Sequence, residues 1–263
     1  MKLRTLLIKL YWISAMQFGF DPRKLFKSVY SLPRYIRDYF KFKKLYRGKL
    51  ELMPCLYDWY EEGGTTKSEY FWQDLLVARL VAEAKPEKHV DVGSRVDGFV
   101  THVASFREIE VFDIRPITTQ IPGIIFKQAD LMNLSDSYGI NSYCDSLSCL
   151  HAIEHFGLGR YGDPIDVNGF ENGFINMVNL LKPGGTFYLS TPIGKERVEF
   201  NSNWVFDPVK IYKLAEMHSM RLQNMINIKQ TGERRSFQPT ESDLVALSNE
   251  RYSLGIFHFI KNY

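Results

Sequence analysis

The run from His89 to Gly98 constrains the fold of this 263-residue chain more than any other stretch. Val90 and Val92 favour a β-strand, and Gly93 can adopt backbone angles that other residues avoid, which lets a ligand approach the main chain. In open α/β sheets, a strand that ends in such a turn and leads into a helix is where nucleotide-like cofactors bind. The run therefore predicts the first strand and the cofactor turn of an α/β domain.

A carboxylate follows the next strand at a suitable distance. The apolar run 109–112 ends at Asp113, twenty residues after Gly93, and that spacing suits an acid that accepts hydrogen bonds from ribose hydroxyls. Four residues separate Gly93 from Gly98, so the turn matches neither GxGxxG nor GxxxxGK[ST]. An ordinary strand, turn and helix with a surface aspartate is the alternative interpretation.

Beyond this turn, runs that favour strands alternate with runs that favour helices, without internal repeats. This order predicts a mainly parallel sheet covered by helices on both faces. The carboxyl ends of the first four strands would then meet at one crevice, which brings together Gly93, Asp113, Asp130 and the pair Leu150 and His151. The further strands are expected at 108–112, 124–128, 145–150, 186–190, 221–229 and 252–261, and helices at 68–84, 99–106 and 169–181.

The positive charge of the chain is concentrated at one end. Residues 1–50 hold thirteen Lys or Arg against two Asp, whereas the remainder holds twenty against twenty-eight acidic residues. We expect two or three amphipathic helices here, with starts at residues 21–22 and 31–33 and a stop at Gly48. Two aromatic and aliphatic stripes are flanked by Lys and Arg; they comprise Leu25, Phe26, Val29 and Tyr30, and then Ile36, Tyr39, Phe40 and Phe42.

Such basic, aromatic helices suit an anionic membrane surface. The alternative is a helical arm that packs its apolar stripe on the main domain or on a twin subunit. Nucleic acid is a less suitable partner, because no recognised nucleic-acid motif accompanies the charge. We therefore expect a basic amphipathic arm at 1–50, a linker or lid at 51–67 and an α/β domain at 68–263, with an oligomer as an open possibility.

Cysteine usage and hydropathy indicate a cytoplasmic protein. Cys55, Cys144 and Cys149 show no CxxC spacing, which indicates a reducing compartment and no zinc site. The apolar stretch 10–20 is too short and too interrupted to span a bilayer, and no signal-peptide cleavage site follows it. A peripheral position on the inner face of the membrane, through residues 1–48, remains compatible with this pattern.

Five segments in order resemble the class I S-adenosylmethionine-dependent methyltransferases. Residues 91–93 are similar to the start of that family's first motif, Asp113 to its ribose-binding acid and 129–131 to its adenine-facing segment; 150–155 and 181–185 resemble the segments after strand four and before strand five. The resemblance covers residues 68–263. It implies a Rossmann-like, seven-stranded, mainly parallel sheet with an antiparallel last strand. The implied ligand is S-adenosyl-L-methionine, bound by Asp91, Gly93, Ser94, Arg95, Asp113, Ile114, Asp130, Leu131 and Leu150.

More narrowly, residues 157–164 and 192–201 resemble a bacterial branch of unassigned function that is associated with surface-polysaccharide assembly. The family's first motif is usually Asp/Glu-x-Gly-x-Gly-x-Gly, but Arg95 and Asp97 occupy its second and third glycine positions. Arg95 could pair with the carboxylate of the cofactor or turn outward. The substitutions also suit a non-catalytic module that docks on a membrane or on an assembly enzyme. An NAD-dependent oxidoreductase is disfavoured because GxGxxG is absent.

Methyl transfer from a sulfonium is an in-line displacement, so the protein has to align the acceptor and remove its proton. The acidic and imidazole side chains after strand four, His155, Glu154 and His151, are the candidates for this work. Their spacing could also gather metal ligands on one helical turn, although no fourth ligand is evident and we expect no metal. They could instead only shape the pocket.

The expected reaction is methylation of a hydroxyl on a glycan, on its lipid-linked precursor or on another small molecule. The glycine-rich loop with Arg160, Tyr161 and Asp163 could contact a sugar or a phosphate, or be a turn held by pairing of arginine and aspartate. An aromatic lid over the cofactor is a further possibility, formed by Tyr57, Trp59, Tyr60, Tyr70, Phe71 and Trp72.

Overall fold

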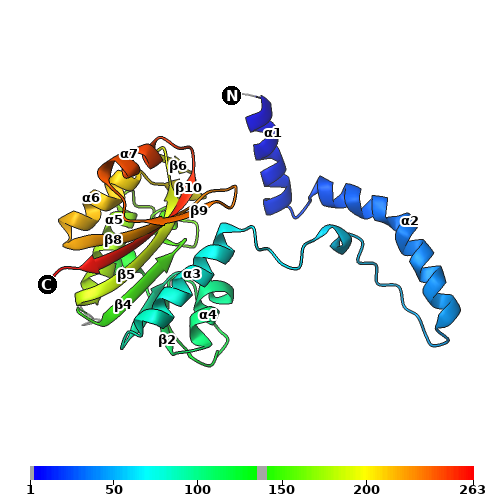
Figure 1. Cartoon of the computed structure of the whole chain (residues 1–263), viewed down its shortest axis with the longest axis horizontal. Coiled ribbons are helices and arrows are strands. Elements are labelled where there is room, and N and C mark those ends of the chain that lie inside the picture. The colour runs from blue at the N-terminus through cyan, green and yellow to red at the C-terminus, as the bar shows by residue number, and fades with distance from the viewer. Residues whose placement is uncertain (1–2, 135–140) are drawn as a thin grey trace. The chain divides into compact units, whose positions relative to one another are not determined.

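The computed structural model describes residues 3–134 and 141–263. The chain divides into two compact units, Met1–Thr65 and Thr66–Tyr263. Figure 1 shows the helices of the first unit and the mixed sheet of the second.

An eight-stranded sheet forms the centre of the second unit (Figure 1), in the order β3-β2-β1-β4-β5-β10-β8-β9. The strands β1 to β5 pair in parallel, whereas β10 pairs antiparallel with both β5 and β8. This confirms the predicted α/β class and the antiparallel last strand. The strands are β1 (His89–Val92), β2 (Ile109–Asp113), β3 (Ile124–Gln128), β4 (Cys144–Leu150), β5 (Leu181–Ile193), β8 (Met220–Ile228), β9 (Arg234–Phe237) and β10 (Ser253–Lys261).

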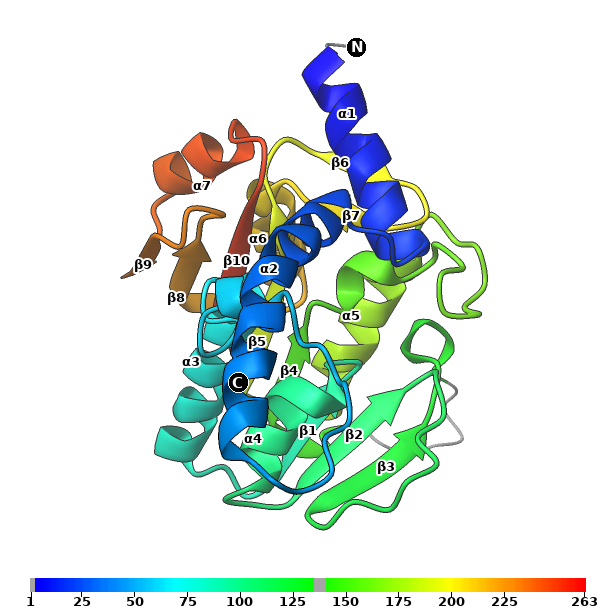
Figure 2. The same ribbon diagram turned by 90° about the vertical axis from the view of Figure 1, so that its right-hand side faces the viewer.

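The prediction of seven strands is wrong by one. The additional strand is β9, which pairs antiparallel with β8 and forms one edge of the sheet. Its sequence, Arg234-Arg235-Ser236-Phe237, is mostly polar and exposed, and an edge strand is held by backbone hydrogen bonds that need no apolar side chains. The other edge is β3, which lies beside β2, and Figure 2 shows β2 between β3 and β1. A separate hairpin, β6 (Arg197–Glu199) with β7 (Asn203–Val205), was also not predicted.

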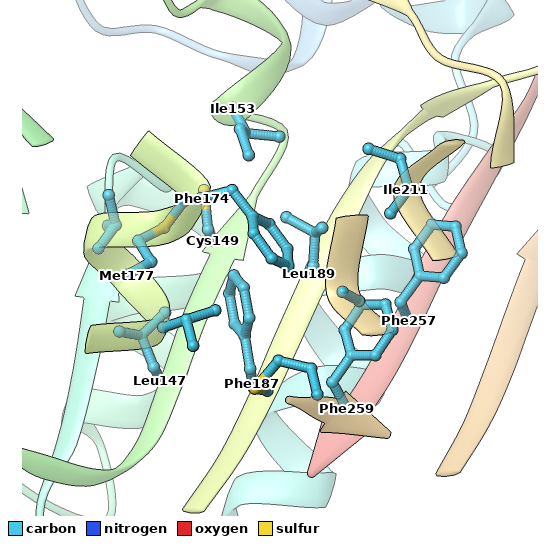
Figure 3. Packing of buried hydrophobic residues seen from close by; sticks show 14 of the residues in the cluster. Leu147, Cys149, Ile153, Phe174, Met177, Phe187, Leu189, Ile211, Phe257 and Phe259 are labelled. Atoms are coloured by element: carbon cyan, nitrogen blue, oxygen red, sulfur yellow. The ribbon is translucent and has the colours of Figure 1, made fainter. Parts of the chain in front are cut away.

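Helices cover both faces of the sheet. On one face, α3 (Glu69–Ala84) contributes Val77 to a cluster of buried apolar side chains. On the other, α5 (Gly169–Leu180) and α6 (Pro208–Met217) contribute residues such as Phe174 to a second cluster. Figure 3 shows this second cluster, in which side chains of α5 face those of the central strands. The alternation of strands and helices in the sequence therefore predicted the layers correctly.

The helices α4 (Thr101–Ala104) and α7 (Glu241–Ser248) of the second unit are shorter. The helix expected at 99–106 is short, because a wide turn at Val96–Val100 precedes α4. Gly98 has φ −124° and ψ −111° within that turn, which interrupts regular helix. Near the far end of the chain, α7 begins with a capping box formed by Thr240 and Asp243.

The long helices of the first unit are α1 (Leu3–Trp12) and α2 (Pro22–Leu45). Asp21 caps α2 by accepting hydrogen bonds from two backbone N–H groups, and Pro22 occupies the first turn, as predicted. The helix start predicted at 31–33 is wrong, since Pro33 lies inside α2. A proline within a helix removes one hydrogen bond, and α2 continues on both sides of it.

The predicted stop at Gly48 is also slightly wrong, because α2 ends at Leu45 and Tyr46 has extended backbone angles. Among the described residues, none of the helices is both long enough and apolar enough to cross a membrane.

Candidate active site

A pocket in the second unit lies where β1, β2, β3 and β4 end. Two of the residues expected to act chemically, His151 and His155, line it. It encloses about 770 Å³ including its open mouth. Of the residues expected to bind the cofactor, those that line it are Gly93, Arg95, Asp113, Ile114, Asp130 and Leu131.

The turn after β1 requires glycine. Gly93 has φ 70°, its N–H donates a hydrogen bond to the carbonyl oxygen of Phe112 at 2.8 Å, and a Cβ atom at this position would lie 2.9 Å from Cβ of Ala152. A side chain would therefore be strained and would crowd the segment after β4. The bare backbone faces the pocket, so a ligand can approach it closely.

Asp91, Ser94 and Leu150 do not line the pocket and instead hold this turn. Asp91 is fully buried and accepts hydrogen bonds from the N–H and Oγ of Ser94, at 3.0 and 2.6 Å, and from Oγ of Ser148 at 2.6 Å. The Oγ of Ser94 in turn accepts a hydrogen bond from the N–H of Leu150 at 3.0 Å. Burial raises the pKa of Asp91 to about 7, against the opposing effect of these hydrogen bonds.

The side chain of Asp113, at the end of β2, is engaged by an arginine that the sequence did not single out. Arg115 donates to one carboxylate oxygen from its backbone N–H at 2.8 Å and from Nε at 3.0 Å, and to the other oxygen from Nη2 at 2.6 Å. Asp113 is buried, and the Arg115 side chain is 42% exposed. The guanidinium also lies 4.4 Å from the centroid of the Tyr161 ring. Arg115 therefore covers the carboxylate expected to bind ribose.

Arg95 pairs with its neighbour at the rim. Its Nε and Nη2 donate to the carboxylate of Asp97 at 3.1 and 2.7 Å, and both side chains are mostly exposed. Gly98, one place after the family's usual glycine position, has a different use, because a Cβ atom there would lie 2.5 Å from a carboxylate oxygen of Asp74 on α3. The displaced glycine thus allows close packing against α3.

After β3, Asp130 begins a short helical turn. Its carboxylate accepts hydrogen bonds from the N–H of Met132 and from the side-chain amide of Asn133, both at 2.9 Å. This turn buries Leu131 and Met132 in the pocket lining, which gives one end of the pocket an apolar surface next to the carboxylate of Asp113.

The hydrogen bonds of His155 define its tautomer. Its Nδ1 lies 2.7 Å from the carbonyl oxygen of Ser202, which can only accept, so Nδ1 carries the proton and Nε2 of the neutral ring is unprotonated. Burial lowers the pKa of His155, the nearby carboxylate of Glu154 opposes this effect, and the cation of Arg160 adds to it. His155 therefore presents a neutral imidazole to the pocket.

Glu154 lies behind His155. Its side chain is buried, Oε2 accepts a hydrogen bond from Oγ1 of Thr191 at 3.3 Å, and Oε1 is 3.9 Å from Nε2 of His155. Oε1 has no hydrogen-bond partner within the described part of the chain. An oxygen buried in this way is costly unless a proton or a charge compensates it, so Glu154 favours the arrival of a proton on His155.

His151 has a positional role in the structure. Its backbone is left-handed, with φ 51°, and its Nδ1 lies 2.7 Å from Oε1 of Gln73 on α3, which also accepts from Ser190 of β5 at 2.6 Å. The ring lies 4.3 Å from that of Tyr70, and burial raises the pKa of Tyr70 to about 12. Gln73 was not predicted, because it lies 78 positions from His151 in sequence.

The backbone after β4 does not gather metal ligands. Left-handed geometry at His151 precedes a single short turn at Ile153–His155, so the helical spacing proposed from the sequence does not apply. Over residues 3–134 and 141–263, no group of three His, Cys, Asp or Glu side chains could hold a metal ion.

The loop after this turn is held by backbone contacts. Asp163 accepts hydrogen bonds from the N–H groups of Gly159 and Tyr161, at 3.0 and 3.1 Å, so the alternative of an Arg160–Asp163 pair is wrong. Arg160 instead donates to the carbonyl oxygen of Ser202 at 2.9 Å. In the described residues it has no carboxylate partner, and it lines the pocket beside His155.

Only part of the proposed aromatic lid lines the pocket of the second unit. Tyr70 does so, whereas Phe71 and Trp72 pack edge to face at 5.2 Å and Arg234 covers the Trp72 ring at 3.5 Å. Tyr57, Trp59 and Tyr60 belong to the first unit, where they pack against α2.

The strand order and the pocket at the strand ends define a Rossmann-like fold. Comparison with solved structures gives the same class. The [4+2]-cyclase SpnF aligns with a TM-score of 0.51 and 12% identity over 72% of this chain and 81% of its own. A structure described as "a putative sarcosine dimethylglycine methyltransferase from Galdieria sulphuraria" aligns with a TM-score of 0.51 and 11% identity, over 73% and 86% respectively. The chain therefore has a fold of the methyltransferase type.

Sequence comparisons add little to this assignment. Residues 124–235 match the family model described as "Caenorhabditis protein of unknown function, DUF268". No curated protein matches the chain. The class of fold is thus established from structure.

Proposed function

We propose that the chain transfers a methyl group from S-adenosylmethionine to a hydroxyl group. The observation that carries this proposal is one pocket that combines a bare glycine turn after β1, a carboxylate after β2 and an unprotonated imidazole nitrogen after β4. A bound S-adenosylmethionine would supply an electrophilic methyl group on sulfur. The backbone at Gly93 would let this ligand approach closely, because no side chain stands there. Asp113 would accept hydrogen bonds from its ribose hydroxyls, and Leu131 and Met132 would contact its adenine base.

His155 is the proposed general base. The carbonyl oxygen of Ser202 keeps the proton on Nδ1, so Nε2 is free to take the proton of an acceptor hydroxyl. The resulting imidazolium would have Oε1 of Glu154 at 3.9 Å, which offsets its charge. Burial lowers the pKa of His155, so the base form predominates at neutral pH.

The proposed acceptor is a hydroxyl of a saccharide, either a glycan or a lipid-linked precursor. The pocket rim supports a polar acceptor, because it carries the guanidinium of Arg160 without a carboxylate partner in the described chain, next to the ring of Tyr161. Guanidinium groups bind phosphate and hydroxyl oxygens through directed hydrogen bonds. We place this reaction in the cytoplasm, at the inner face of the membrane.

A second candidate function is a non-catalytic module that keeps the fold. The observation that favours it is the side chain of Arg115, which already occupies both oxygens of Asp113. In such a module Asp113 would bind Arg115 permanently, and docking on a membrane or on an assembly enzyme would be the function.

Calorimetry with S-adenosylhomocysteine separates the two functions. We expect binding by the wild-type chain and a loss of about ten-fold or more in Asp113→Asn, since hydrogen bonds to a charged acceptor contribute about 1.5–3 kcal/mol each. Glu233→Ala, which removes an exposed carboxylate outside the pocket, should bind as the wild type does. Absence of heat at millimolar ligand would refute the methyltransferase proposal, and equal binding by Asp113→Asn would refute the role of Asp113.

A further inference from the structure

The face of α2 that carries the apolar stripe remains exposed. Leu25, Val29, Ile36 and Phe40 are spaced by four, seven and four positions, which places them on one side of a helix. Their exposed fractions are 53%, 56%, 50% and 56%. The two short stripes predicted from the sequence are thus one continuous stripe, because α2 passes through Pro33 without ending.

Another segment of the first unit, which follows α2 in sequence, packs on the opposite side of this helix. Ser31, on that side, is buried and donates a hydrogen bond to the hydroxyl of Tyr60 at 3.3 Å. The ammonium of Lys27 lies 5.1 Å from the Tyr60 ring, and the guanidinium of Arg34 lies 3.9 Å from the ring of Trp59. The segment that contains Trp59 and Tyr60 therefore covers polar and basic positions of α2. It leaves the apolar stripe uncovered within its own unit.

The charge of the unit points to an anionic occupant. The first unit, residues 1–65, contains thirteen Lys or Arg and six acidic residues. Asp21 accepts from the hydroxyl of Tyr11 at 2.6 Å and caps α2, and Asp38 pairs with Arg37 at 3.0 Å. Glu61 lies 3.9 Å from the ammonium of Lys24, and Glu51 pairs with Lys49. The basic residues of the first unit nevertheless outnumber its acidic residues by seven.

We propose that this unit binds the surface of a bilayer that contains anionic phospholipids, with the Leu25–Phe40 stripe in the headgroup region. A second copy of the chain is a poor occupant, since it would bring the same excess of positive charge to the same face. A helix with an apolar side and an excess of lysine and arginine suits a position in the plane of an anionic interface. The absence of a spanning helix among the described residues agrees with a peripheral position.

The test is flotation of the full chain with lipid vesicles. We expect it to float with vesicles of phosphatidylcholine and phosphatidylglycerol, to float less as salt is added, and to float weakly with phosphatidylcholine alone, because salt screens the attraction between surface charges. The double variant Val29→Glu with Ile36→Glu should bind at least about 25-fold more weakly, since each charge near such a surface changes binding by about five-fold. The loss of apolar contact adds to this effect.

A matched control introduces the same two glutamates at exposed apolar positions of the second unit. Met217→Glu with Val245→Glu introduces the same two charges at exposed apolar positions of α6 and α7, and should float as the wild type does. Unchanged far-ultraviolet circular dichroism and thermal unfolding would show that both variants fold.

Three outcomes would overturn the proposal: no flotation of the wild type, equal flotation of the stripe variant, or equal binding to neutral and anionic vesicles at all salt concentrations. Sedimentation velocity without lipid is the further check. A dimer that the stripe variant abolishes, together with no flotation, would assign the stripe to a second copy instead. None of these measurements uses S-adenosylmethionine, so their failure is distinct from failure of the proposed reaction.

Discussion

Replacing Arg115 with alanine is expected to tighten the binding of S-adenosylhomocysteine. In the structure the guanidinium of Arg115 occupies both carboxylate oxygens of Asp113, at 3.0 Å from Nε and 2.6 Å from Nη2. A carboxylate has about four lone-pair sites. The guanidinium uses two of them, and the backbone N–H of Arg115 uses one more. Ribose hydroxyls can therefore reach both oxygens of Asp113 only if the guanidinium moves away. This movement costs free energy in the wild-type chain but not in Arg115→Ala, which lacks the guanidinium.

The size of the effect follows from how exposed the pair is. Hydrogen bonds to a charged group contribute about 1.5–3 kcal/mol when buried, whereas exposed ion pairs contribute about 0.2–1 kcal/mol. Asp113 is buried and Arg115 is 42% exposed, so we take an intermediate value of about 1–2 kcal/mol. This corresponds to a decrease in Kd of about 5- to 30-fold in Arg115→Ala.

Isothermal titration calorimetry of both chains measures this change directly. Arg235→Ala is the matched control, because Arg235 also lies near a carboxylate, Asp243 at 3.7 Å, and over a ring, Phe237 at 4.2 Å, but outside the pocket. Its Kd should equal that of the wild type. An equal or higher Kd in Arg115→Ala would refute the reasoning and would mean that Arg115 stays on Asp113 or itself contacts the ligand.

Three further predictions concern protonation and the glycine turn. In an NMR titration, His155 should show a pKa below its ordinary value of 6.5, because burial disfavours its cation; Glu154→Gln should lower this pKa further by removing the opposing carboxylate. In urea unfolding, Gly93→Ala should lower the free energy of unfolding by about 2–4 kcal/mol, because the position combines a positive φ with a close contact. Gly232→Ala should lower it by only about 1–2 kcal/mol, because Gly232 has a positive φ but open space around it. Asp91 has a raised pKa in the folded chain, so the unfolding free energy should fall as pH rises from about 4 to about 7 and then level off. In Asp91→Asn this part of the pH dependence should disappear. Its persistence in the variant would contradict the raised pKa of Asp91.

The fold was predictable where apolar periodicity dominates. Val90 and Val92 identify β1 because these alternate positions of the strand both pack into one apolar cluster, and Ser68 identifies the start of α3 by capping it. The polar strand β9 was not predictable in this way, because only its backbone pairs with β8. Pro33 misled the prediction of helix boundaries, because α2 continues through it.

The site was predictable in outline only. Counting from Gly93 places Asp113 and Asp130 at neighbouring strand ends, which the parallel sheet brings to one pocket. The side-chain partners were not predictable, since Gln73 meets His151 through packing of α3 on the sheet, and Ser202 reaches His155 from a distant hairpin connection. Hydrogen bonds of this kind depend on side-chain direction, which a single sequence does not encode in any short pattern.

The position of β10 has a consequence for how the chain is made. It follows the other strands in sequence, yet it lies between β5 and β8 in the sheet. During synthesis, β5 and β8 must therefore wait with unpaired backbone edges until residues 253–261 have left the ribosome, and unpaired edges are sites of aggregation. A nascent or truncated chain that lacks this strand is expected to need chaperone protection, although all the pocket-lining residues have already been made.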